Sequence, residues 1–252
     1  MPRFAPLIKV PRARRYNAEV ILEGDDFDAA LAHARQLQTE RTQCFIPTFD
    51  DPAVIASQRT LGLEIREQVP DVQAIIVPVG GGGLISGMSG AQARSIRIIG
   101  VQAERMPGMQ AALRARSLLS CPPASTLADG IAVRRVGDLT LPLMQRYVDE
   151  VVTVKETEIA HAILLLLEDE KTVVESAAAT TLAALLNRPL ELRKQQVLLL
   201  IGRKYRREYY CARHRKRLGS GGAGPASLLS SRTGLEHSPR SAILSLSRVL
   251  MF

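Results

Sequence analysis

The fold is decided by one stretch of the chain, Ala74-Ile75-Ile76-Val77-Pro78-Val79-Gly80-Gly81-Gly82-Gly83-Leu84. Its apolar first part is short and unbroken, which predicts a strand buried on both faces and favours a parallel sheet. The four glycines lack a Cβ, so the backbone can turn tightly and approach a ligand closely. A small-residue helix is predicted to follow, and the N–H groups at its start favour an anion. The stretch therefore predicts a phosphate-binding loop at the carboxyl end of a buried strand.

Strand and helix patterns alternate along the chain from residue 51 to residue 201. Asp51 is a good helix cap, and Pro52 after it suits the first helical position. The predicted strands are residues 74–79, 96–101, 150–154 and 196–201. The predicted helices are residues 52–68, 84–93, 109–119, 139–147, 156–168 and 173–186. This alternation predicts a doubly wound α/β domain with a mostly parallel sheet over residues 51–201.

Residues 1–50 show shorter patterns. Apolar runs predict strands at 7–10, 19–22 and 44–46, and residues 11–16 are expected to be helical. A helix with apolar residues near 3.6 spacing is predicted to start after Asp25 and Asp26, either of which can cap it.

Composition limits the class of protein. The chain has 252 residues, of which 46% are hydrophobic. No apolar run approaches the ~20 residues that span a membrane, and the first residues lack a signal-peptide pattern. Cys44, Cys121 and Cys211 are scattered and odd in number, which predicts ordinary thiols in a reducing compartment. We expect a cytoplasmic protein without a membrane partner.

The positive charge lies at the end of the chain. Residues 202–252 hold 11 of the 33 Lys and Arg residues and 2 of the 25 Asp and Glu residues, so this tail is +9 and the rest is −1. The basic run contains Tyr205, Tyr209 and Tyr210, and such a run could bind nucleic acid by neutralising phosphates and stacking bases. A disordered Ser- and Gly-rich tail is the simpler interpretation.

Several motifs together resemble one enzyme family. These motifs are Phe49-Asp50-Asp51-Pro52, Val77 to Leu84, Leu127-Ala128-Asp129-Gly130-Ile131 and Val174-Glu175-Ser176. They resemble threonine dehydratase and its serine-racemase-like relatives, which are pyridoxal-phosphate (PLP) enzymes of fold type II, the tryptophan-synthase-β fold. The resemblance covers residues 7–201. It implies a large PLP-binding α/β domain at 51–201, a remnant of a smaller α/β domain at 1–50, and hence an incomplete fold.

The resemblance also implies a cofactor and a reaction. In the family the glycine loop binds the PLP phosphate, a role that falls here on Gly80, Gly81, Gly82, Gly83 and Leu84. The family reaction is β-elimination from L-threonine or L-serine, which releases ammonia and, from threonine, 2-oxobutanoate. An amino-acid substrate and a homo-oligomer are the partners that this implies.

The departures from the family pattern concern the reacting groups. The Schiff-base lysine of the family lies in a Ser-x-Lys-x-Arg-Gly stretch, followed by a Gly-Asn-containing substrate loop, and neither motif occurs in this sequence. None of the six lysines has that context: Lys9, Lys155, Lys171, Lys194, Lys204 and Lys216. We therefore expect no catalytic residue, no covalent attachment of PLP and no activity from this chain alone.

The change of character after Gly202 has a further interpretation. In the family the last strand is followed by Ser/Thr-Gly-Gly-Asn, whereas here Arg203 and Lys204 follow Gly202. Synonymous codons for residues 204–227, read one nucleotide later, can encode the family's continuation. Residues 231–251 in the remaining frame can encode a stretch similar to an ACT-like regulatory tail. The tail at 202–252 is therefore expected to be disordered or frame-shifted, and the coding DNA would decide.

The glycine loop leaves alternatives open. By spacing, Gly81-x-Gly83-x-x-Ser86 approximates the dinucleotide fingerprint, and Glu104 follows about 20 residues later, as a ribose-binding acid would. A Rossmann-type NAD-binding domain is thus a second hypothesis, weakened by Ser in the third position, and a purely structural turn is a third. Glu104 could instead help to hold a divalent cation, although a surface carboxylate is the default and no metal site is predicted. Asp129 is interpreted as a turn cap.

Overall fold

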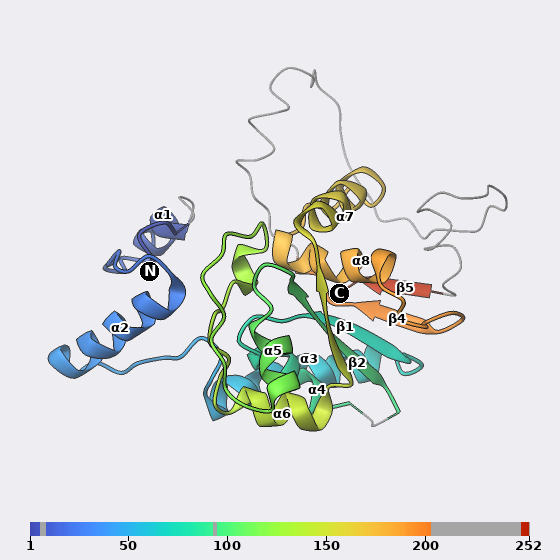
Figure 1. Cartoon of the computed structure of the whole chain (residues 1–252), viewed down its shortest axis with the longest axis horizontal. Coiled ribbons are helices and arrows are strands. Elements are labelled where there is room, and N and C mark those ends of the chain that lie inside the picture. The colour runs from blue at the N-terminus through green and yellow to red at the C-terminus, as the bar shows by residue number, and fades with distance from the viewer. Residues whose placement is uncertain (6–8, 93–94, 203–247, 252) are drawn as a thin grey trace, which may run out of the picture.

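The computed structural model describes residues 1–5, 9–92, 95–202 and 248–251, the last of these by their backbone alone. Its centre is a five-stranded sheet in the order β3-β2-β1-β4-β5, and every pairing in it is parallel (Figure 1). The strands are β1 (Ala74–Pro78), β2 (Arg97–Ala103), β3 (Glu150–Val154), β4 (Gln196–Leu199) and β5 (Arg248–Met251). The predicted parallel α/β fold is confirmed.

Strand β1 is the middle of the sheet because it pairs on both sides. Ile76 is in register with Ile99 of β2 and with Leu199 of β4. All three side chains are fully buried. The unbroken apolar run of β1 thus has the burial on both faces that its sequence predicts.

Helices cover both faces of the sheet. One face carries α3 (Pro52–Gln68), α4 (Gly83–Ser89), α5 (Gly108–Ala115) and α6 (Thr140–Tyr147), while α7 (Glu156–Glu168) and α8 (Ser176–Asn187) cover the other (Figure 1). The chain runs outward from β1 to β3 and then returns across the second face to β4. The strand order therefore reverses between β1 and β4, and open α/β sheets bind ligands at the carboxyl ends of the strands at such a point.

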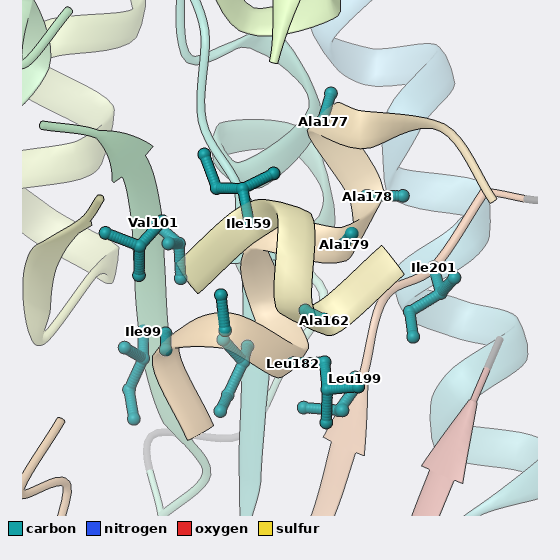
Figure 2. Packing of buried hydrophobic residues seen from close by; sticks show 14 of the residues in the cluster. Ile99, Val101, Ile159, Ala162, Ala177, Ala178, Ala179, Leu182, Leu199 and Ile201 are labelled. Atoms are coloured by element: carbon teal, nitrogen blue, oxygen red, sulfur yellow. The ribbon is translucent and has the colours of Figure 1, made fainter. Parts of the chain in front are cut away.

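Small residues bring the helices close to the sheet and to each other. Ala178 and Ala179 of α8 belong to one buried cluster with Ile99 of β2 and Leu199 of β4 (Figure 2). On the opposite face, α3 and α4 pack closely at two glycines. A Cβ on Gly62 would lie 2.4 Å from the Met88 carbonyl oxygen, and one on Gly87 would lie 2.1 Å from the Ile55 carbonyl oxygen.

The strands predicted for the N-terminal region are wrong wherever the structure describes their residues. Residues 9–10 of the expected strand at 7–10 begin helix α1 (Lys9–Arg14), and residues 6–8 lie outside the described residues. Residues 19–22 and 44–46 belong to no strand. The backbone around 21–24 instead bonds to the first residues of the chain, since the Glu23 N–H donates to the Met1 carbonyl at 2.9 Å and Arg3 N–H to Gly24 at 2.8 Å. A strand pattern forms a strand only where a sheet edge pairs with it.

Helix α2 (Phe27–Arg41) follows the expected cap. The Asp26 carboxylate accepts the Ala29 N–H at 2.8 Å, and Asp51 likewise accepts the Ala53 N–H at 2.8 Å at the start of α3. In Figure 1, α2 lies to the side of the sheet and α3 lies beneath the sheet. No side chain of α1 or α2 is buried.

Several helix ends differ from the sequence prediction. Helix α4 stops at Ser89 and not near residue 93, because Gly90 takes the C-cap position. Helix α5 stops at Ala115, because Arg116 adopts a left-handed conformation with φ 52°. Helix α8 starts at Ser176, three residues later than predicted, since Glu175 has extended dihedral angles. The loop at 126–131 contains a short 3-10 helix, η1 (Asp129–Ile131).

The division into residues 1–50, 51–201 and 202–252 stays a prediction, and most of the basic tail lies outside the described residues. The four residues of β5 were not expected to form a strand. Across the parts of the chain that the structure describes, no helix combines the length and apolar character of a membrane span. Cys44 and Cys121 are free thiols, and burial raises the pKa of the Cys121 thiol.

Candidate functional site

A cavity of about 1410 Å³ opens at the carboxyl ends of β1 and β4. The glycine loop forms part of its wall, together with the residues that follow β4 and the loop around η1. Residues of the N-terminal segment form another part of the cavity wall. The main lining residues are Gly80, Gly81, Gly82, Gly83, Leu84, Leu200, Ile201, Gly202, Asp129 to Arg134, Glu175, Met1, Phe4, Lys9, Phe27 and Phe49. All five residues predicted to bind an anion therefore lie in one wall.

The loop needs glycine because its neighbours leave no room for a Cβ. A Cβ on Gly81 would lie 2.4 Å from the Phe49 ring, and one on Gly83 would lie 2.8 Å from the Phe49 Cβ. Gly82 has φ 96°, a left-handed conformation that other residues rarely adopt, and its Cβ would meet the Met109 Cε at 2.8 Å. The chain therefore presents bare backbone to the cavity at these positions.

The first turn of helix α4, which follows the glycine loop, has free backbone N–H donors. Helix α4 begins at Gly83, and the Ser86 N–H donates to the Gly82 carbonyl at 3.0 Å. The N–H groups of Gly83, Leu84 and Ile85 precede that bond, so they have no carbonyl partner within the helix. These donors, with the loop that leads to them, suit an anion bound in the cavity.

Charged side chains border the cavity on the N-terminal side. The Lys9 Nζ donates to the Asp129 Oδ2 at 3.2 Å, and the Arg134 Nη1 donates to the Asp26 Oδ2 at 2.5 Å. The Ala29 N–H and then Arg134 lower the pKa of the Asp26 carboxyl. The two ion pairs join the segment before residue 51 to the loop around η1, and Asp129 is thus more than a turn residue.

Sequence reasoning missed four residues at this site. Lys9 lay in a segment read as a strand, and Phe49 was noted only as part of a motif. Met109 and Thr140 each lie in an ordinary helix pattern, where no local signal indicates contact with a loop. Each acts through a contact between distant parts of the chain.

Glu104 does not lie in the cavity wall. It is exposed directly after β2, and its N–H donates to the Val154 carbonyl at 2.8 Å. Among the described residues, no group of three or more His, Cys, Asp or Glu side chains could hold a metal ion.

Comparisons with known proteins place this site in a family. The family model for pyridoxal-phosphate dependent enzymes matches residues 1–202. The chain therefore belongs to the pyridoxal-phosphate dependent enzyme family, and the predicted resemblance is confirmed. Family membership implies PLP as the cofactor.

Individual relatives show which members of the family this chain resembles. The chain is 52% identical over 167 residues to an L-threonine ammonia-lyase of Thermotoga maritima, a match that covers 65% of this chain and 42% of the relative. A threonine deaminase structure from Solanum lycopersicum superposes with a TM-score of 0.67 at 35% identity, over 73% of this chain and 51% of that one. The structure of maize serine racemase superposes with a TM-score of 0.68 at 33% identity, over 73% of this chain and 56% of that one. The neighbours bear out the predicted fold type II.

The chain spans about half or less of the curated relatives that it matches, from 32% to 51% of their length.

The residues present fit the phosphate end of PLP. Gly81, Gly82 and Gly83 form a cradle of bare backbone, since a Cβ at any of them would clash with Phe49 or Met109, and the backbone donors of α4 border it. The cradle follows β1 at the point where the strand order reverses between β1 and β4, which is the expected ligand position for this sheet.

Proposed function

We propose that this chain carries the phosphate-binding part of a PLP site of the threonine-dehydratase type. Gly80, Gly81, Gly82, Gly83 and Leu84 would bind the phosphate through backbone N–H groups. One observation carries the proposal: the four glycines line the cavity at the switch point of the sheet, and at Gly81, Gly82 and Gly83 a Cβ would lie 2.8 Å or less from a neighbouring atom.

The substrate class follows from the relatives. L-threonine or L-serine would be the amino acid, and bound PLP would supply the electron sink for a carbanion at its Cα. Phe27 and Phe49 border the cavity, with ring centroids 6.1 Å apart, and give it an apolar surface on that side. Glu175, the residue that precedes α8, also lines the cavity.

We further propose that the 252-residue chain alone is inactive and binds PLP without a covalent bond. Among the lysines that the structure describes, Lys9 is the one in the cavity wall, and its ammonium group is engaged by Asp129. The sequence around Lys9 does not match the family's Schiff-base motif.

The dinucleotide hypothesis is less well supported. The strand order found here also occurs in dinucleotide-binding sheets, so the order does not discriminate. The fingerprint needs an acidic residue at the ligand, whereas Glu104 lies outside the cavity wall. Ser86 stands at the third glycine position and is buried in α4.

Binding of three ligands to the purified chain tests the proposal. PLP should bind more tightly than pyridoxal, which lacks the phosphate, and NAD should not compete. Tight NAD binding, or equal affinity for PLP and pyridoxal, would contradict the phosphate role.

Borohydride reduction tests the absence of covalent attachment. Reduction with PLP present, followed by peptide mass mapping, should leave every lysine without a pyridoxyl group, and no 2-oxobutanoate should form from L-threonine. A pyridoxyl group found on Lys9 would overturn the proposed absence of a covalent bond, and 2-oxobutanoate formed from L-threonine would overturn the proposed inactivity; neither result would affect the phosphate role.

A further inference from the structure

The phosphate loop is tied to helix α6 by one buried hydroxyl group. The Thr140 Oγ1 donates to the Gly81 carbonyl at 2.6 Å. Its contact with the Gly137 carbonyl is longer, at 3.4 Å. A hydroxyl has one proton to donate, so the shorter contact is the dominant bond. Thr140 is 0% exposed, and water cannot replace this donor.

Helix α6 is itself fixed from the N-terminal side by Asp50. The Asp50 carboxylate accepts three successive N–H groups, from Asp138 at 2.9 Å, Leu139 at 3.0 Å and Thr140 at 3.3 Å. These are the donors that the start of a helix leaves unpaired. Gly137 makes this approach possible, because a Cβ there would lie 2.1 Å from the Asp50 Oδ1.

The bond to Gly81 determines the direction of a donor on the other side of the loop. The Gly81 carbonyl and the Gly82 N–H belong to one planar trans peptide unit, so they point in opposite directions. With the carbonyl held against buried Thr140, the Gly82 N–H is directed away from α6. Gly81 and Gly82 line the cavity, whereas no residue of α6 does, so we infer that the cavity lies on the face of the loop toward which the Gly82 N–H is directed.

Without this bond the peptide unit could turn over. Glycine stands on both sides of it, and glycine permits conformations that other residues exclude. A turned peptide would present the carbonyl oxygen to the cavity and repel an anion.

We propose that Asp50 and Thr140 are positioning residues for the cofactor phosphate. Asp50 fixes the start of α6, and Thr140 fixes the Gly81 peptide so that the Gly82 N–H faces the phosphate. This inference rests on the proposed phosphate-binding function. Neither side chain touches the cofactor, so both act through the backbone of the loop.

Thr140→Val tests the hydroxyl, because valine keeps the shape and removes the donor. The dissociation constants of PLP and pyridoxal are measured for the full chain by equilibrium dialysis. Thr140→Val should weaken PLP binding about tenfold and leave pyridoxal binding within about twofold, as expected for loss of one directed hydrogen bond. Thr140→Ser, which keeps the donor, should restore the preference for PLP.

Matched variants separate positioning from a general loss of stability. Thr181 is also 0% exposed and donates to a carbonyl of its own helix, Ala178, at 2.9 Å. Thr181→Val should therefore lower stability without changing the PLP-to-pyridoxal preference. Asp50→Asn should reduce that preference, whereas Asp51→Asn, which alters the cap of α3, should not.

The outcomes distinguish the inference from the function on which it rests. If the unaltered chain does not prefer PLP over pyridoxal, the phosphate-binding function fails. If the unaltered chain prefers PLP and both Thr140→Val and Asp50→Asn keep that preference, the function stands and the positioning role is wrong. Circular dichroism verifies that each variant compared is folded, and Asp50→Asn provides the test should Thr140→Val not fold.

Discussion

The Arg188 guanidinium and the Glu158 carboxylate form a two-point ion pair, with Nη1 3.1 Å from Oε1 and Nη2 2.6 Å from Oε2. The Arg188 Nε donates in addition to the Thr153 carbonyl at 2.6 Å. One side chain thus ties the end of α8 to α7 and to β3. The two side chains are only 23% and 17% exposed, so solvent screens this pair weakly.

Arg188→Lys should destabilise the chain by about 2 kcal/mol, because a lysine cannot make the planar two-point contact and the bond to Thr153 together. Urea unfolding followed by circular dichroism measures the change. Arg135 offers the control, since it pairs with Asp138 at 3.1 and 3.0 Å but the two side chains are 50% and 57% exposed. Arg135→Lys should cost less than about 0.5 kcal/mol. Equal losses in the two variants would show that the burial of the pair is unimportant.

The α3–α4 contact predicts opposite effects for two glycine substitutions in one region. Gly87→Ala would put a Cβ 2.1 Å from the Ile55 carbonyl oxygen, so the two helices must separate. We expect a loss of about 2 kcal/mol or more, as overpacking in a core gives. At Gly90 the nearest atoms are 3.5 Å away and φ is −63°, so Gly90→Ala should be neutral or slightly stabilising. A thermal melt of each variant gives the comparison, and a Gly87→Ala protein as stable as the unaltered chain would contradict the close packing.

Two acids at the start of α2 should affect stability in opposite directions as pH changes. The Ala29 N–H and Arg134 lower the pKa of Asp26, whereas burial and then the Asp26 charge raise the pKa of Asp28. A lowered carboxyl pKa stabilises the fold above the ordinary value of 3.8, and this contribution is lost as pH falls through the folded pKa. A raised carboxyl pKa has the reverse sign, because the charged form costs stability at higher pH.

Asp26→Asn should therefore destabilise the chain at pH 7, while Asp28→Asn should leave it equally or more stable. The gap between the two variants should close on acidification, first through the raised pKa of Asp28 and then through the lowered pKa of Asp26. Urea unfolding at a series of pH values measures this. A gap that stays constant down to pH 3 would mean that these carboxyls do not titrate differently in the folded state.

The sheet domain follows closely from local patterns. The unbroken apolar run of β1 predicts a strand buried on both faces, and the Asp51-Pro52 pair locates the start of α3 to the residue. Strand β3 and helix α7 likewise have the bounds that their patterns indicate. In each case the decisive signal lies within the element itself.

The N-terminal region and the supports of the site follow far less from sequence. Residues 19–22 have a strand composition, but a strand also needs a partner edge, which no local pattern reports. The bond from Thr140 to Gly81 joins residues 59 positions apart. The glycines indicate where the ligand loop lies, whereas the side chains that shape it become visible only once the helices are packed.

The contact between Phe49 and the glycine loop gives a prediction that a second substitution can rescue. In Gly81→Ala the new Cβ would lie 2.4 Å from the outer atoms of the Phe49 ring, and Phe27 packs against that ring with a centroid distance of 6.1 Å. The loop must move, and PLP affinity should fall about tenfold, which corresponds to about 1.4 kcal/mol. Removing the ring in Gly81→Ala/Phe49→Ala should restore most of the affinity relative to Phe49→Ala alone.

Gly83→Ala provides the matched control, because its Cβ would meet the Phe49 Cβ at 2.8 Å and the Phe49 Cα and carbonyl oxygen at 3.0 Å, all of which alanine keeps. Truncating the ring does not move those atoms, so Phe49→Ala should not rescue Gly83→Ala. The four dissociation constants of each double-mutant cycle, measured for PLP, give the coupling directly. A coupling near zero for Gly81 and Phe49, or equal coupling for both glycines, would show that the ring does not determine the shape of the cradle.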